Sequence, residues 1–141
     1  MTADTPVINA TIARNTVGLT DGNGILAVAR GAAGTLNARI TGNTVAAPLT
    51  GTREGIRVDA GNNSSTGDKV CVALTGNTSA GSGGTLGIGL RRQSAPASAV
   101  FGIVGAGGAT SSPAVEAYVN GQNPAGGGTL LISATTGFSS C

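Results

Sequence analysis

Short segments in which aliphatic and polar residues alternate recur along most of the chain. The text of residues 9–17 (NATIARNTV) returns at 37–45 (NARITGNTV) and, with a changed first residue, at 71–79 (CVALTGNTS). A second segment, which contains Gly-Ile each time, stands at 24–28, 55–59 and 87–91. Both segments recur at intervals of roughly 30 residues, a period typical of solenoids and other repeat folds. The pattern therefore predicts a repeat architecture.

Each repeat predicts short β-strands that are separated by tight turns. Ala10 and Ile12 alternate with Thr11 and Ala13, which is the two-residue period of a strand with one buried face. We expect the Asn that follows, Asn15 in the first repeat, to take left-handed backbone angles and bend the chain. Three strands per repeat would then stack on their equivalents in the next repeat.

Stacking places equivalent residues of successive repeats in columns. The predicted aliphatic columns are Ile12/Ile40/Leu74, Ile25/Ile56/Ile88 and Ala27/Val58/Leu90. A fourth column is expected to form a hydrogen-bonded ladder, because parallel strands lie about 4.8 Å apart; its members are Asn15, Asn43 and Asn77. The fold class is therefore all-β, a right-handed parallel β-helix of about three coils plus a C-terminal strand, with one short capping α-helix.

The C-terminal segment departs from the repeat and is expected to close the stack of coils. Ser112 and Pro113 suit the N-cap and first position of a helix near 112–121. Gly121 suits the residue that follows a helix, and a final strand is expected near 129–134.

The helix has one apolar face, made by Val115, Tyr118 and Val119 at helical spacing. We treat the chain as a single domain, 1–141, with a lead-in at 1–8, coils at 9–104 and a cap at 105–141. No comparable cap precedes the first coil, so this end is expected to meet either upstream coils or another subunit.

The amino-acid composition excludes several classes of function. Of the 141 residues only 10% are charged and 2% aromatic, and His and Trp are absent. The net charge is +2 with scattered basic residues, so the basic stripe and stacking aromatics of a nucleic-acid surface are missing. No apolar run reaches the ~18 residues that suggest a membrane span. Without His, the usual zinc and Ser-His-Asp sites are excluded, and we expect no cofactor.

The two cysteines, Cys71 and Cys141, are either unrelated thiols or one disulfide. A terminal Cys with a partner in the third repeat favours a bond that pins the C-terminus to the coils. Closing a loop of ~70 residues would contribute roughly 4 kcal/mol in the chain-entropy model. Such a bond implies an oxidising compartment, and hence an extracellular or cell-surface location.

The candidate for a catalytic or binding site is an outward-facing cluster of charged residues, Arg57, Asp59 and Arg91. A lyase would need calcium-holding carboxylates beside an Arg base, and a hydrolase would need two paired carboxylates. Only Asp59 is acidic in this column, and Glu54 is not expected to face the same groove. We therefore favour a surface ion pair between Asp59 and Arg91, worth about 0–1 kcal/mol.

The repeated text resembles the coils of pectate-lyase-like and large bacterial surface proteins. The likeness rests on the I-x-x-N-T-V phrase at 12–17 and 40–45, followed by Gly-Ile strands, and covers roughly residues 9–92. The tail is similar to the closing segment of some bacterial β-helix proteins: an Arg-containing strand, a short helix, a Gln-Asn-Pro-Gly-Gly-like turn and a terminal Cys region. Here these stand at 90–92, 113–122, 123–127 and 138–141. The resemblance implies an architecture and says little about activity.

These observations predict a non-enzymatic structural module of a secreted bacterial protein, a stiff β-solenoid segment. Its expected partners are upstream coils or further subunits, with polysaccharide or cell-surface contact through its loops. One alternative is a self-assembling subunit of an extracellular fibre or oligomer, which docks through its uncapped first coil. The other is a carbohydrate-binding or polysaccharide-degrading remnant that acts through Arg57 and Asp59.

Overall fold

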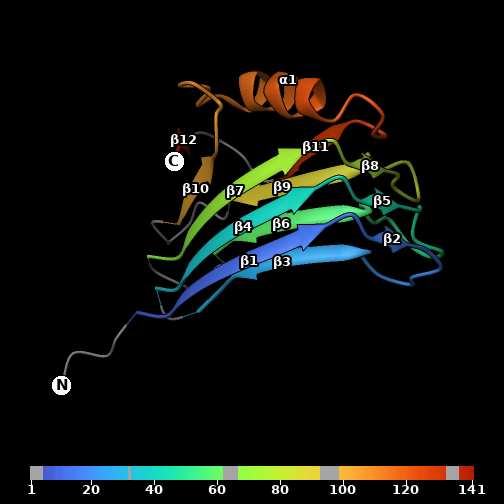
Figure 1. The fold of residues 1–141 in the computed structure, drawn as a ribbon, viewed down its shortest axis with the longest axis horizontal. Coiled ribbons are helices and arrows are strands. Elements are labelled where there is room, and N and C mark those ends of the chain that lie inside the picture. The colour runs from blue at the N-terminus through green and yellow to red at the C-terminus, as the bar shows by residue number, and fades with distance from the viewer. Residues whose placement is uncertain (1–4, 32, 62–66, 93–98, 133–136) are drawn as a thin grey trace.

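The computed structural model describes residues 5–31, 33–61, 67–92, 99–132 and 137–141. Within these residues the first three repeats contain three strands each (Figure 1). They are β1 (Val7–Ala13), β2 (Thr16–Val17) and β3 (Ile25–Ala29); β4 (Thr35–Thr41), β5 (Thr44–Val45) and β6 (Ile56–Ala60); β7 (Lys69–Thr75), β8 (Thr78–Ser79) and β9 (Ile88–Arg92). The remaining elements are β10 (Val100–Ile103), α1 (Ser112–Gln122), β11 (Thr129–Ile132) and β12 (Phe138–Ser140).

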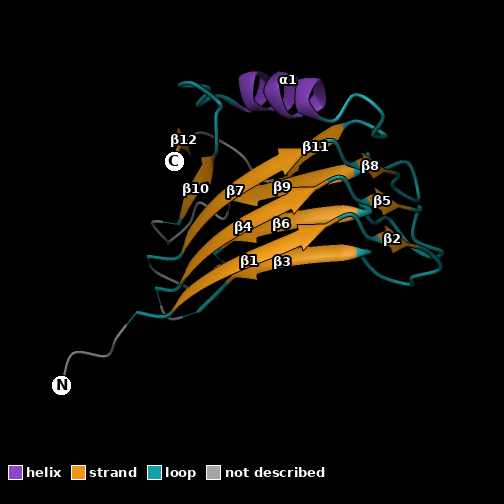
Figure 2. Cartoon of the chain, viewed as in Figure 1, coloured by secondary structure: helices purple, strands orange, loops and turns teal. Residues whose placement is uncertain are grey.

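The described strands form three parallel sheets, one for each strand of the repeat. Sheet 1 has the order β1-β4-β7-β10-β12, sheet 2 the order β2-β5-β8, and sheet 3 the order β11-β9-β6-β3. The strands within each sheet run in the same direction and stack from one repeat to the next (Figure 2). The predicted all-β architecture with parallel strands and one helix is thereby confirmed.

The register places the predicted columns opposite one another. Ile12 lies opposite Ile40, which lies opposite Leu74, and Ile25, Ile56 and Ile88 align in the same way. Ile40 and Ile56 are fully buried between the sheets. Burying an aliphatic side chain of this size contributes about 1.5–3 kcal/mol, so these columns supply the core that a chain poor in aromatic residues needs.

The sharp bend after each long strand is made by a different residue from the one expected. Arg14, Gly42 and Gly76 have φ angles of 56°, 63° and 65°, whereas the Asn that follows each of them is not left-handed. A left-handed backbone is strained for most side chains and free of strain for Gly, which explains the Gly in the second and third repeats. Because the preceding residue makes the bend, the Asn can point its side chain into the interior.

The C-terminal segment follows the order of the repeat, except that a helix replaces one strand. β10 joins sheet 1 and β11 joins sheet 3, so α1 occupies the position in sequence that a sheet 2 strand holds in the other repeats. β12 then returns to sheet 1 beside β10. The apolar segment 100–104 and the final segment near 129–134 were expected to be strands, and β10 and β11 lie there, whereas β12 was not expected. Residues 133 and 134 of the expected final strand lie outside the described residues.

Helix α1 packs against β7 and β11 and lies across the last repeats (Figure 1). Val115 and Val119 are fully buried and Tyr118 packs beside them, as the predicted apolar face requires. The N-cap is Ser111, one residue earlier than expected, and the helix continues through Gly121 to end at Gln122. No helix in the described part of the chain is long and apolar enough to cross a membrane.

Candidate functional site

A ladder of asparagine side chains runs through the interior where sheets 1 and 2 meet. The backbone N–H and the Nδ2 of Asn15 both donate to Oδ1 of Asn43, at 3.0 and 2.9 Å. Asn43 makes the same pair of bonds to Asn77, again at 3.0 and 2.9 Å. Asn43 and Asn77 are almost completely buried, so the bonds that they make replace those to water.

The ladder has a fourth member that the repeat pattern does not reveal. The N–H and Nδ2 of Asn77 donate to Oδ1 of Asn123, at 2.9 and 3.0 Å. Asn123 is also the C-cap residue of α1, and its Nδ2 donates to the backbone oxygens of Leu74 and Val119 at 3.1 and 2.8 Å. The helix therefore ends at Gln122, with Asn123 rather than Gly121 as the residue that follows it, because the ladder holds Asn123 in place.

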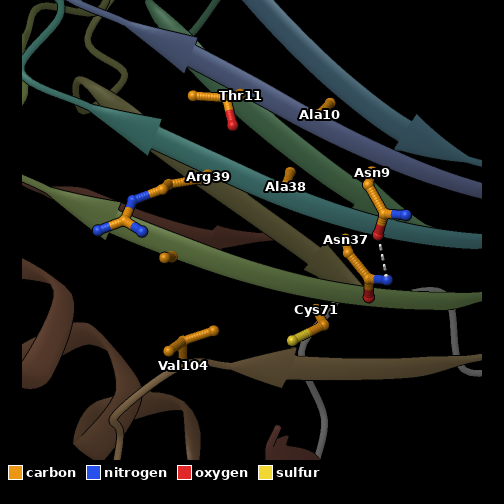
Figure 3. Close-up of a pocket in the computed structure, with 9 residues that line it drawn as sticks. Asn9, Ala10, Thr11, Asn37, Ala38, Arg39, Cys71 and Val104 are labelled. Carbon is orange, nitrogen blue, oxygen red and sulfur yellow. Dashed lines mark hydrogen bonds between the residues drawn. The ribbon is translucent and has the colours of Figure 1, made fainter.

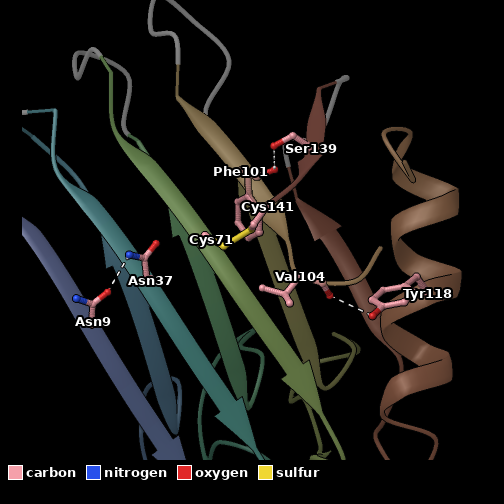
Figure 4. The surroundings of a disulfide bond; sticks show 8 residues. All are labelled: Asn9, Asn37, Cys71, Phe101, Val104, Tyr118, Ser139 and Cys141. Carbon is pink, nitrogen blue, oxygen red and sulfur yellow. Dashed lines mark hydrogen bonds between the residues drawn. A yellow bond between two sulfur atoms is a disulfide. The ribbon is translucent and has the colours of Figure 1, made fainter. Parts of the chain in front are cut away.

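A disulfide joins Cys71 on β7 to Cys141, the last residue, with 5.9 Å between the Cα atoms (Figure 4). This is the pairing that the sequence analysis favoured. Between these two residues lies Gly102 on β10, which is opposite Cys71 and Ser139 in the sheet register. A Cβ at Gly102 would lie 2.6 Å from Sγ of Cys141. The bond therefore needs a residue without a side chain beneath it.

The outer face of sheet 1 beside the disulfide carries a shallow hollow of about 360 Å³ (Figure 3). Its polar feature is a second, exposed asparagine pair, in which Nδ2 of Asn37 donates to Oδ1 of Asn9 at 2.8 Å. The next residue in this row is Cys71, so the pair does not extend further. Apart from Arg39, the side chains that line this hollow are short, and they do not converge on a point.

The outward charged cluster is larger than predicted and lies on the outer face of sheet 3. Arg57 and Asp59 stand on β6, Arg91 on β9, and Arg30 directly after β3. The Asp59 carboxylate accepts from Nη2 of Arg30 at 2.5 Å, from Nε of Arg57 at 3.0 Å and from Nη2 of Arg91 at 2.9 Å. Sequence reasoning missed Arg30 because the residue follows the strand and lies outside the repeated text.

The predicted surface ion pair between Asp59 and Arg91 is therefore a buried network around one carboxylate. The Asp59 side chain is 1% exposed, whereas those of Arg57 and Arg91 are 14% and 19% exposed. Removing a carboxylate from water costs several kcal/mol unless charged hydrogen bonds compensate it. Three guanidinium groups provide that compensation here. Asp59 is thus a centre that holds arginines in position.

Glu54 joins the same network from the turn before β6. Its Oε2 lies 3.5 Å from Nη1 of Arg57 and 3.1 Å from Nδ2 of Asn23, and the residue is 2% exposed. Space for it is provided by Gly89, where a Cβ would lie 2.6 Å from Cγ of Glu54. Glu54 and Asp59 were not expected to face one groove, yet both contact Arg57.

No protein-family model, curated protein or solved structure matches this chain.

Proposed function

We propose that this chain is a non-enzymatic structural module of a secreted or surface-exposed bacterial protein, folded as a short right-handed parallel β-helix. The observation that carries the proposal is the continuous ladder of Asn15, Asn43, Asn77 and Asn123. Four side chains in successive layers satisfy one another's hydrogen bonds, which gives each layer one favoured position over the next. Such a stack resists bending and local opening.

The disulfide supports the extracellular part of the proposal. Bonds of this kind persist in oxidising compartments and are rare in reducing ones. The bond also limits the freedom of the unfolded chain, by roughly 4 kcal/mol for a loop of this length. Together the ladder and the disulfide suit a module that keeps its shape outside the cell, where no chaperone restores it.

The module should resist proteolysis in its native state. Trypsin cleaves after Arg39 on β4 and Arg57 on β6 only when these strands open. We expect cleavage at both positions to be slower than in the unfolded chain by ~100-fold or more, because opening populations of such strands approach those of global unfolding. Mass spectrometry measures the rate of each cleavage in the native protein and in a reduced sample unfolded in urea. Native cleavage after Arg39 at a rate close to that of the unfolded sample would show that the stack is not rigid.

A second candidate function is self-assembly through the first repeat. β1, β2 and β3 are the edge strands of their sheets, and Oδ1 of Asn15 accepts no bond from the described residues. Ile8 is in register with Leu36, yet Ile8 is 59% exposed and Leu36 only 6%. Unpaired edges of this kind pair with further strands, and a second copy of the chain would cover both the edge and the apolar column.

If a second copy covers this edge, the particle mass should increase with protein concentration in light scattering. Ile8→Lys should lower the association constant by about tenfold or more, because it places a charge in the apolar contact. Leu49→Lys is the matched control, since Leu49 has the same 59% exposure but lies outside the first repeat. A constant monomer mass at every concentration would contradict self-assembly. It would leave the structural module as the better explanation.

A further inference from the structure

The outer face of sheet 3 contains a pocket of about 290 Å³ with an unusual charge balance. Its lining includes Arg30, Arg53, Arg57, Arg91, Asp59 and Asn23, a set that we call the arginine pocket. Half of the eight basic residues of the chain are in this set. Asp59 lines the pocket and Glu54 lies behind it, so four guanidinium groups face two carboxylates and two positive charges are not balanced locally.

Three of the four arginines are held in place before any ligand arrives. Asp59 contacts one nitrogen each of Arg30, Arg57 and Arg91, and a guanidinium carries five N–H donors. Most of these donors are therefore left for another acceptor. Because Asp59 is buried beneath them, its position is fixed by the sheet, and little side-chain entropy remains to be lost on binding.

One N–H donor of an arginine that lines the pocket has no acceptor. Nε of Arg91 is buried and has no hydrogen-bond partner among the described residues. An unpaired buried donor costs about 1–3 kcal/mol, and this one belongs to a charged group. The guanidinium of Arg53 likewise forms no ion pair within the described part of the chain. Arg53 thus retains its donors, and Arg91 carries an unsatisfied one, in a pocket that already has excess positive charge.

We propose that the arginine pocket is a binding site for a compact oxyanion of charge −2, a phosphate or sulfate group. Guanidinium groups bind such anions through paired N–H···O bonds, and a partly enclosed pocket strengthens the attraction. The charge of −2 equals the local excess. A monovalent carboxylate leaves one of these charges uncompensated, so the site favours phosphate and sulfate over acetate. The inference is independent of the structural role proposed above.

The test is titration calorimetry of the oxidised protein with inorganic phosphate, sulfate or acetate, with chloride keeping the ionic strength constant. Phosphate and sulfate should bind at one site per chain, at least about tenfold tighter than acetate. Calorimetry is preferred to thermal melting because sulfate and phosphate stabilise folded proteins without binding at a site. Methyl phosphate distinguishes a free ion from a group on a larger molecule. Equal or tighter binding of the ester indicates an attached group, and weaker binding indicates the free ion.

The variants Arg53→Gln and Arg30→Gln remove guanidinium groups from the more exposed side of the pocket and leave the Arg57–Asp59–Arg91 contacts intact. Each should weaken phosphate binding about tenfold or more. Arg39→Gln, on the exposed face of sheet 1, removes the same charge elsewhere and should change the affinity less than twofold. The proposal is overturned if phosphate shows no saturable binding, or if Arg39→Gln weakens binding as much as Arg53→Gln does. Urea unfolding of each variant verifies that it is folded.

Discussion

Replacing Asn77 with Ala should lower the free energy of unfolding by about 4 kcal/mol. The side chain accepts from the N–H and Nδ2 of Asn43 and donates to the backbone oxygen of Ile40 and to Oδ1 of Asn123. Asn77 is fully buried, so water cannot replace these bonds. Leaving two or more buried polar groups without partners costs about 1–3 kcal/mol each. The measurement is equilibrium unfolding in urea with the disulfide intact.

The control for this experiment is Asn37→Ala, which makes the same chemical change on the outer face of sheet 1, away from the ladder. This substitution removes one exposed hydrogen bond, between Asn37 and Asn9. It should change the free energy of unfolding by no more than about 0.5 kcal/mol. Similar losses for the two variants would mean that the buried ladder contributes no more than a surface contact. The rigidity attributed to it would then lack support.

Replacing Asp59 with Asn should destabilise the protein by about 3 kcal/mol or more. The change keeps the shape of the side chain and removes its charge, so Arg30, Arg57 and Arg91 lose the carboxylate to which they donate. Breaking one side of a buried ion pair typically costs about 3–5 kcal/mol, because the remaining charges are left uncompensated. Urea is the denaturant of choice here, since guanidinium chloride would screen the charges under study.

Asp21→Asn provides the matched comparison for Asp59→Asn. Asp21 is exposed in the turn before β3, and the same loss of one negative charge there should alter the unfolding free energy by less than about 0.5 kcal/mol. If both substitutions have equally small effects, the contacts around Asp59 are ordinary surface ion pairs, as the sequence alone suggested.

The repeated part of the fold could be predicted because stacking imposes a requirement on the sequence. A residue at a fixed position in each layer meets its own equivalent above and below, so Ile, Val and Asn recur at one interval. Asn15, Asn43 and Asn77 were recognised in this way. The disulfide was favoured because Cys71 opens the third repeat and Cys141 ends the chain.

The features that were not predicted from the sequence are those that do not recur from one repeat to the next. Asn123 follows a helix that stands in place of a strand, so no equivalent text marks it as the fourth member of the ladder. Arg30 and Glu54 lie outside the strands. The long side chain of Arg30 reaches Asp59, and that of Glu54 reaches Arg57. A signal for Glu54 does exist: Gly89 stands where Arg57 and Leu26 stand in the preceding strands, and a missing side chain in a regular column indicates that something else fills the space.

The disulfide also determines how the molecule would carry tension. A pull applied between the N-terminal strand and Cys141 follows the backbone only as far as Cys71 and then crosses the covalent bond directly to the last residue. The 70 positions of sequence separation spanned by the bond, which include β8 to β12 and helix α1, are bypassed by the load. Under such a pull only the first two repeats and the start of β7 can be peeled away. The arginine pocket would lose all its charged residues except Arg91 with those repeats, whereas the capped end would stay folded as an anchor.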